Sequence, residues 1–349
     1  MFLGNFIIFL LTISNGFYAN SFLGNSIKIN DHKLTICKAC EDNYHFTCSV
    51  WDGECMDTLI FEGGGVRAVV YSGAVKRLEE NDMMGKIKNM AGTSSGAQTA
   101  ALLCCGYKSS EIKTALKLAP WKKILNGGFS LKGLYFLLSR FGIYDTYFLE
   151  SYLDHLIYLK TGKKEITFEE LYNISNIHLK VGVCSLRDQE FKYLDHISYP
   201  NMPVSKGLLA SSSIPVLFTA TKWNEECFTD GGIVGNLPTT AFPSKKCLAF
   251  NLFSDNEFKH RKENPKNLLS FIKIVLNILV ENSREIYSPK NRYIENIDFI
   301  EIFTGNVGIL ETNMDEKTIN QLHDYGYLAV DTFLDSRIKP NEKFCKKEN

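Results

Sequence analysis

The sequence Gly-Thr-Ser-Ser-Gly at residues 92–96 constrains the possible fold of this chain most, because it separates a strand-like pattern from a helix-like pattern. The mostly apolar residues 88–91 before it predict a short strand, and the small and apolar residues 95–103 after it predict a helix. Glycines on both sides of Ser94 suit a tight strand-to-helix turn, where Cβ atoms have little room. Such a turn raises a serine hydroxyl beside a helix N-terminus, which favours negative charge. The alternative is a chance match, against which the strand–turn–helix context argues.

A run of three glycines forms a second loop, between a predicted strand at 57–62 and a predicted helix at 66–81. A loop of this kind can hold a nucleotide phosphate, but neither Gly-Lys-Ser/Thr nor Gly-x-Gly-x-x-Gly is present. The glycine run fits an oxyanion hole better, because the backbone N–H donors of such a hole must approach the substrate closely. Arg67 adds positive charge for a phosphate head group, and a plain tight turn is the alternative. The predicted oxyanion donors are Gly63, Gly64 and Gly65.

Asp230 is the acid in a turn-rich segment at residues 229–238. Asp-Gly is a common turn dipeptide, so an ordinary turn is one interpretation. The functional interpretation is a general base that the fold brings to Ser94. No histidine stands in a glycine-rich or turn context typical of a catalytic triad, so we expect a Ser–Asp dyad in preference to Ser-His-Asp. The histidines considered are His155, His178, His196, His260 and His323.

In this order, the motifs Gly-Gly-Gly-x-Arg, Gly-x-Ser-x-Gly and Asp-Gly-Gly resemble those of the patatin-like phospholipases. Segments 142–145, 166–171 and 210–218 resemble further parts of that family, so the resemblance covers most of the chain. It implies a three-layer α/β/α fold with a mainly parallel central sheet and a catalytic dyad of Ser94 and Asp230. It also implies hydrolysis of acyl esters in phospholipids or other lipids at a membrane surface, without a metal or other cofactor.

One position departs from the family pattern. The family often has Gly after the basic residue of its first motif, and this chain has Ala68 there. A methyl group at that position would narrow the predicted oxyanion hole or change its angle.

Two other functions stay open on the sequence alone. One is a catalytically inactive lipid-binding or structural protein on the same fold, against which retention of all three motifs argues. The other is an acyltransferase, since an acyl-enzyme intermediate is common to hydrolysis and transfer. The formal net charge is zero over 349 residues, and no segment resembles a nucleic-acid-binding module, so nucleic acid is not an expected partner.

The N-terminus differs from the rest of the chain. The apolar run at residues 6–13 predicts a signal peptide over residues 1–19, although no Lys or Arg precedes the run. The expected location is therefore secreted or the endomembrane lumen; an uncleaved membrane anchor and a buried N-terminal strand are the alternatives. Residues 20–56 are cysteine-rich, which indicates two disulfides, favoured by export, or a zinc site with His45. The four cysteines are Cys37, Cys40, Cys48 and Cys55.

Three segments complete the predicted organisation: the cysteine-rich part, a lipid acyl hydrolase domain at 57–335, and a basic tail at 336–349. A helical stretch at 109–171, broken at Pro120, Gly127-Gly128 and Gly142, is a candidate lid or acyl-chain wall. Ordinary core packing is expected for most of its apolar residues, which are Trp121, Phe129, Leu131, Leu134, Tyr135, Phe136, Leu137 and Leu138. The other predicted elements are strands 88–92, 178–185, 247–252 and 298–303, a β pair near 190–194, and helices 95–106, 267–282 and 315–334.

Overall fold

The computed structural model describes residues 56–126, 130–254 and 296–338, with the short pieces 264–266, 270–272, 274–275, 278–279 and 283 between them. The predicted signal peptide, the four N-terminal cysteines, His260 and Phe129 lie outside the described residues. The same holds for the tail beyond residue 338 and for most of the helix expected at 267–282. Those predictions therefore stay predictions.

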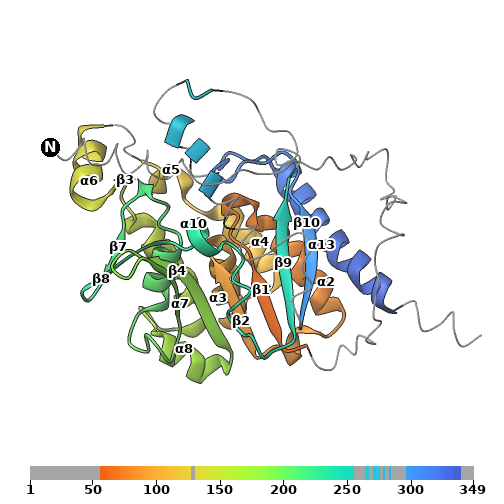
Figure 1. Ribbon diagram of the computed structural model, residues 1–349. Helices are drawn as coiled ribbons and strands as arrows, with labels where there is room; N and C mark the ends of the chain where they lie inside the picture. Colours follow the sequence, from red (N-terminus) through yellow and green to blue (C-terminus); the bar gives the residue numbers. More distant parts are fainter. Residues whose placement is uncertain are drawn as a thin grey trace, which may run out of the picture. The chain divides into compact units, whose positions relative to one another are not determined.

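The described chain is built on an eight-stranded sheet with the order β10-β9-β1-β2-β4-β8-β7, and β5 pairs with β4 (Figure 1). The strands β10, β9, β1, β2 and β4 run parallel to one another, whereas β5, β8 and β7 join the sheet in antiparallel pairs. The predicted mainly parallel sheet is confirmed. The strands are β1 (Thr58–Phe61), β2 (Asn89–Thr93), β4 (His178–Ser185), β5 (Glu190–Leu194), β7 (Thr221–Trp223), β8 (Glu226–Asp230), β9 (Cys247–Phe253) and β10 (Ile297–Phe303).

Helices flank this sheet, and a separate two-stranded sheet joins β3 (Gly142–Tyr144) to β6 (Val216–Phe218). The 3₁₀ turns are η3 (Gly65–Val69) and η4 (Met84–Lys86). The larger helices are α2 (Val70–Glu80), α3 (Ser95–Cys104), α4 (Ser109–Leu118), α6 (Leu131–Arg140), α7 (Tyr147–Thr161), α8 (Phe168–Ser175), α9 (Val204–Ser211) and α13 (Glu316–Ile338). The short helices are α5 (Trp121–Ile124) and α10 (Gly232–Gly235).

The central strands are buried on both faces, as their continuous apolar runs predict. Alternate residues of β1 enter different cores, since successive strand side chains point to opposite faces. Phe61 packs with Phe250 and Tyr71 on one face, with ring centroids 5.1 Å apart in each pair. Ile60 packs on the other face with a smaller cluster that includes Leu237 and Phe242. This arrangement confirms the three-layer α/β/α fold.

Some elements differ from the sequence prediction. The helix expected at 66–81 begins with the 3₁₀ turn η3, and the stretch 109–171 contains the short strand β3 as well as helices. The elements α9, β6, β7, β8 and α10 were not predicted. Both β3 and β6 have three residues, too few to show a periodicity, and Gly207 weakens the helical pattern of α9. In the part of the chain that the structure describes, no helix is long and apolar enough to cross a membrane.

Candidate active site

Strand pairing brings Ser94 and Asp230 together. Strand β2 runs along β4 and ends with Thr93 opposite Gly182. Strand β8 pairs with β4 in the opposite direction and ends with Asp230 opposite Val183, the next residue of β4. The ends of β2 and β8 therefore meet at consecutive residues of one strand. Ser94 follows directly after β2, which places it beside Asp230 despite their distance in the sequence.

Ser94 occupies the strand-to-helix turn that the sequence predicts. Its backbone has φ 53° and ψ −125°, in the positive-φ region that non-glycine residues adopt only under strain. The flanking glycines allow the turn to close. A Cβ atom on Gly92 would lie 2.4 Å from the carbonyl carbon of Gly96, and one on Gly96 would lie 2.4 Å from the Phe61 oxygen. Side chains at these two positions would push α3 away from the strands.

A serine on α9 holds this turn from the other side. The Ser94 N–H donates to Ser211 Oγ at 2.7 Å, and Ser211 Oγ donates to the Gly182 carbonyl at 2.6 Å. Two residues on, the Ser213 carbonyl accepts from the Asp230 N–H at 2.9 Å. The segment Ser211–Ser213 thus contacts both members of the predicted dyad. The consecutive serines in the sequence were the signal for this role, which the motifs alone did not reveal.

Asp230 is buried, with 5% of its surface exposed. Burial raises the pKa of its carboxyl group to about 7, because a charged group loses hydration there, while hydrogen bonds from Gly232 N–H and the Ser94 side chain act in the opposite direction. The Gly232 N–H donates to Asp230 Oδ1 at 2.7 Å. A carboxyl group with this pKa exchanges protons near neutral pH, as a general base must.

Two of the three glycine N–H groups in the predicted oxyanion loop are engaged inside the protein. The Gly63 N–H donates to the Asn236 carbonyl at 3.1 Å, and the Gly64 N–H donates to Ser95 Oγ at 2.9 Å. Within the described residues, the Gly65 N–H makes no hydrogen bond. Gly65 has φ 57°, and a Cβ there would lie 2.0 Å from the Ile309 carbonyl oxygen. The loop therefore requires glycine at this position.

Asn236 fixes the same loop through its side chain. Its Nδ2 donates to Glu62 Oε1 at 2.8 Å and to the Gly63 carbonyl at 3.0 Å. Asn236 follows α10, which begins two residues after Asp230. One short segment therefore supplies both the candidate base and a clamp on the glycine loop. The interpretation of the Asp-Gly-Gly motif from the sequence did not include Asn236.

Arg67 lies in a different setting from the one expected for a head-group contact. Only 5% of its surface is exposed, and its Nε donates to the Gly64 carbonyl at 3.3 Å. The glycine loop itself is therefore one of its partners. Ala68, where the family often has Gly, is fully buried in η3 beside Arg67.

Two histidines of the described chain form hydrogen bonds away from the candidate dyad. His178 Nε2 pairs with Asp195 Oδ2 at 2.9 Å, and His323 Nδ1 with Ser72 Oγ at 2.8 Å. The His196 ring stacks on Tyr172. Within the described ranges, the hydrogen bonds of these residues do not reach Ser94 or Asp230. The described residues also hold no group of three or more His, Cys, Asp or Glu side chains that could bind a metal ion.

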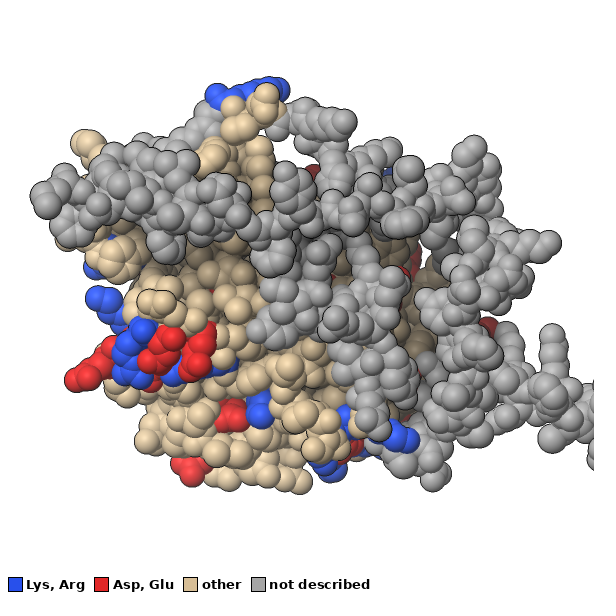
Figure 2. Space-filling view, in the orientation of Figure 1, with Lys and Arg blue, Asp and Glu red and all other residues tan. Residues whose placement is uncertain are grey.

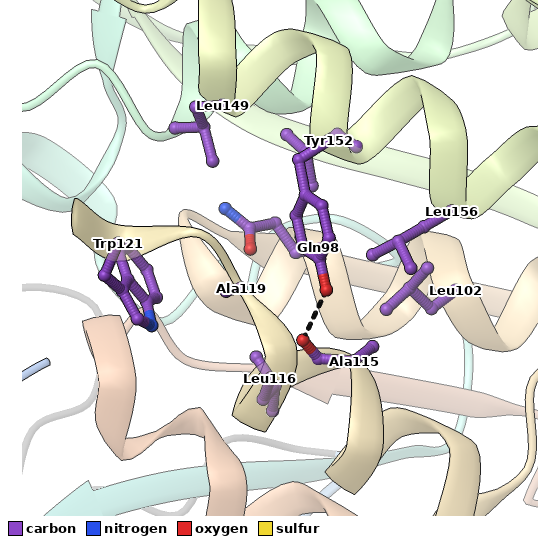
Figure 3. A pocket seen from close by; sticks show the side chains of 10 residues that line it. Gln98, Leu102, Ala115, Leu116, Ala119, Trp121, Leu149, Tyr152 and Leu156 are labelled. Atoms are coloured by element: carbon purple, nitrogen blue, oxygen red, sulfur yellow. Dashed lines mark hydrogen bonds between the residues drawn. The ribbon is translucent and has the colours of Figure 1, made fainter. Parts of the chain in front are cut away.

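An apolar pocket begins one helical turn beyond Ser94. Gln98 and Leu102 line it from α3, at the fourth and eighth positions after Ser94, on the same helix face. Figure 3 shows both side chains beside the pocket, with Trp121 and Tyr152 around it. The cavity is narrow, with a volume of about 20 Å³.

A wider groove of about 530 Å³ lies between α4 and α7 and shares three lining residues with the pocket, Ala115, Tyr152 and Leu156. The Tyr152 hydroxyl donates to the Ala115 carbonyl at 2.6 Å, the dashed line in Figure 3. This hydrogen bond lies in the wall between the two spaces.

Comparison with known proteins shows which family the chain resembles. The model of the patatin-like phospholipase family matches residues 59–243. The chain is 25% identical over 279 residues to the uncharacterized protein R571 of Acanthamoeba polyphaga mimivirus, covering 78% of this chain and 91% of that protein. It is 28% identical over 183 residues to the probable lipid hydrolase 463L of Invertebrate iridescent virus 6, covering 52% and 61%.

A solved structure has the same fold. VipD from Legionella pneumophila matches with a TM-score of 0.53 and 19% identity over 81% of this chain and 67% of that one. The family match spans β1 to the segment after α10 and includes all three motifs. The chain belongs to the patatin-like phospholipase family.

Proposed function

We propose that this protein hydrolyses carboxylic esters of phospholipids or other acyl lipids, with Ser94 as nucleophile and Asp230 as general base. The observation that carries this proposal is the meeting of β2 and β8 on β4, which sets a buried carboxyl group beside a serine in a strained turn. Membership of a phospholipase family and similarity to a probable lipid hydrolase support the substrate class.

The first half of the reaction forms an acyl-enzyme. Ser94 Oγ attacks the ester carbonyl carbon while its proton passes to the Asp230 carboxylate, and the carbonyl oxygen becomes an oxyanion. The C–O bond to the leaving alcohol then breaks, and the alcohol oxygen takes the proton from Asp230. In the second half, water attacks the acyl carbon and gives its proton to Asp230, and Ser94 leaves with that proton as the carboxylic acid is released.

Two backbone N–H groups are available for the oxyanion. The Gly65 N–H has no internal partner among the described residues, and the Ser95 N–H belongs to the first turn of α3, where intrahelical partners are lacking. The residue after the nucleophile commonly contributes a donor at such turns. We assign the hole to these two groups, while Gly63 and Gly64 hold the loop in shape through their own bonds.

The pocket beside Gln98 is the proposed place for the acyl chain. It follows the face of α3 that begins at Ser94, and most of its lining is apolar. Because the cavity is narrow, a long chain would enter only if a lining side chain such as Trp121 or Tyr152 moves.

The test is incubation of the purified full chain with vesicles of mixed phospholipids, followed by mass analysis of the products. The proposal predicts free fatty acid and lysophospholipid that increase with time. Transfer of the acyl group to an added alcohol, with no free acid, would identify an acyltransferase instead. No product from any phospholipid or neutral acyl lipid would favour an inactive lipid-binding protein.

A further inference from the structure

Helix α6 turns an apolar stripe toward solvent. Its side chains Leu131, Leu134, Tyr135 and Leu138 are 89%, 52%, 62% and 73% exposed. Their spacing of three and four residues places them on one face, which in a globular protein normally packs against the core. The expectation of ordinary core packing is therefore wrong for these four residues. In α6, Gly133 and Phe136 are the buried residues instead.

The exposed apolar surface continues beyond the helix. Phe141 follows α6 directly, and Tyr147 and Phe148 begin α7; all three side chains are exposed. Strand β3 lies between the end of α6 and the start of α7 in the sequence. Figure 1 shows α6 in yellow at one end of the sheet, next to β3. Large apolar side chains exposed in such number within one short segment mark an interaction site.

Unpaired positive charges accompany this stripe. The sequence contains no Asp or Glu from residue 112 to residue 144, yet it has exposed basic side chains there. Lys132 and Arg140 lie 5.3 Å and 4.9 Å from the centre of the Phe136 ring. Lys122 and Lys123 are exposed on α5. In the described chain, none of these four cations has an ion-pair partner.

The charges near β7 and β8 are arranged differently. Figure 2 shows blue and red side chains interleaved over that hairpin. There Lys192 and Arg187 pair with Asp188 and Glu226, so their charges are neutralised locally. Lys132 and Arg140 of α6, and Lys122 and Lys123 of the preceding helix α5, are available to an anionic partner, and this difference selects α6 as the binding surface.

Backbone contacts connect α6 to the active site. The Arg140 carbonyl accepts from the Ala220 N–H at 3.1 Å, and Gly142 pairs with Val216 across β3 and β6. Val216 has φ 69°, a strained value for a β-branched residue. Only a few residues separate Val216 from Ser213, which binds Asp230. The stripe is therefore fixed to the segment that shapes the catalytic turn.

We infer that the exposed face of α6, extended by Phe141, Tyr147 and Phe148, inserts into the surface of a membrane that contains anionic lipids. A helix with an exposed apolar stripe and unpaired cations on its other sides is the pattern of a helix that lies in the membrane interface. Anionic lipid attracts each nearby Lys or Arg, and the apolar side chains supply burial. This inference rests on the proposed lipid hydrolysis and adds the surface by which the protein reaches its substrate.

The test measures sedimentation of the full chain with vesicles, using Ser94→Ala so that no lipid is degraded. One set of vesicles is phosphatidylcholine, and in the other a third of the lipid is phosphatidylserine. We expect binding to the anionic set, reduced at least about tenfold by Leu134→Ser/Leu138→Ser through lost apolar burial. Lys132→Glu should reduce it at least about fivefold, and salt should weaken it.

Matched changes elsewhere serve as controls. Ile174→Ser/Leu328→Ser removes two apolar side chains of similar exposure from α8 and α13, and Lys86→Glu reverses a distant exposed charge. Neither should change vesicle binding. Thermal unfolding of every variant identifies any that fail to fold, and for those the single changes Leu138→Ser and Leu134→Ser replace the pair.

Three outcomes would overturn the inference. The first is equal binding of both vesicle types, and the second is unchanged binding in the α6 variants. The third is an α6 variant that alters oligomeric state in light scattering but not vesicle binding, which would assign the face to a second copy of the chain. Vesicle binding by the Ser94→Ala protein without hydrolysis by the wild type would instead refute the proposed function and leave this inference standing.

Discussion

Ser94 has a positive φ that costs a non-glycine residue on the order of 1–3 kcal/mol. The surroundings hold it there through the bond from its N–H to Ser211 and through the close packing of Gly92 and Gly96. At the scale of single residues, the motifs predicted Ser94, Asp230 and the glycine loop, because each is a short local pattern. They did not predict Ser95, Ser211 or Asn236, whose roles depend on hydrogen bonds between distant segments.

Asp230→Asn should lower the rate of hydrolysis without lowering the stability of the fold. The amide cannot accept the serine proton, so hydrolysis should fall at least about a hundredfold. In the wild type, the rate should rise with pH around a midpoint near 7, since the carboxylate is the active form and its pKa is about 7. Rate measurements on the variant and across pH check both statements; the single changes His178→Ala and His323→Ala are the controls and should cost far less.

The same substitution should stabilise the fold at alkaline pH. The folded pKa of Asp230 is raised above its unfolded value of about 4, so the wild type loses stability as the pH rises from about 4 to about 7. Asparagine carries no such charge, and we expect the free energy of unfolding to be higher than wild type by roughly 1–4 kcal/mol at pH 8. Denaturant unfolding at pH 5 and pH 8 measures this. A variant less stable than wild type at pH 8 would show that the carboxylate is well solvated or paired in the fold.

Substitution of Arg67 distinguishes two roles. One is support of the glycine loop, which its observed hydrogen bond provides, and the other is the predicted contact with a phosphate head group. Arg67→Met removes the bond from Nε to the Gly64 carbonyl, which should lower the free energy of unfolding by about 1–3 kcal/mol. We expect kcat to fall, with KM for anionic and zwitterionic phospholipids changing by the same factor, and Arg67→Lys to restore part of the rate. A rise in KM confined to anionic lipids would instead support the predicted contact between Arg67 and the lipid head group.

At the scale of elements, α3 connects the nucleophile to the apolar pocket along one face. The sequence predicted this helix and placed an acyl-chain wall in residues 109–171. It could not place the pocket, because α4, α5 and α7 reach it only through the packing of separate helices. Nor did it reveal that α6 exposes its apolar face, since a periodic apolar pattern is the same whether the face meets a core or a membrane.

Tyr152→Ala should change the preferred acyl-chain length. The tyrosine ring stands between the narrow pocket and the groove of about 530 Å³, so its removal joins the two spaces. We expect longer chains to be cleaved better relative to short ones, whereas Tyr158→Ala, on the same helix but absent from both linings, should leave the ratio unchanged. Competition between esters of different chain length measures the ratio, and an unchanged ratio in Tyr152→Ala would exclude this pocket as the acyl site.

At the scale of the whole molecule, the decisive feature is the end-to-end arrangement of β2 and β8 on β4. The βα order of the sequence predicted a mainly parallel sheet, and the family motifs implied a Ser–Asp pair. The antiparallel entry of β8 and its register with Val183 depend on the pairing of strands far apart in the chain. No local pattern contains that information.

Hydrolysis should not respond to chelation. The proposed oxyanion donors are backbone N–H groups, which need no ion to act. We therefore expect full activity after dialysis against EDTA, measured on the same vesicles before and after treatment. Loss of activity that calcium restores would mean that a metal ion takes part.

The role of Ser94 as the nucleophile is tested by measuring hydrolysis of phospholipid vesicles by the wild type and by Ser94→Ala. The same proteins are treated with a fluorophosphonate, and the position of the adduct is mapped. We expect fatty acid release by the wild type, none above background by the variant, similar thermal unfolding of the two proteins, and an adduct on Ser94 alone. Ser336→Ala, a change at an exposed serine of α13, should retain full activity. Wild-type turnover by Ser94→Ala, or an adduct on another residue, would show that Ser94 is not the nucleophile.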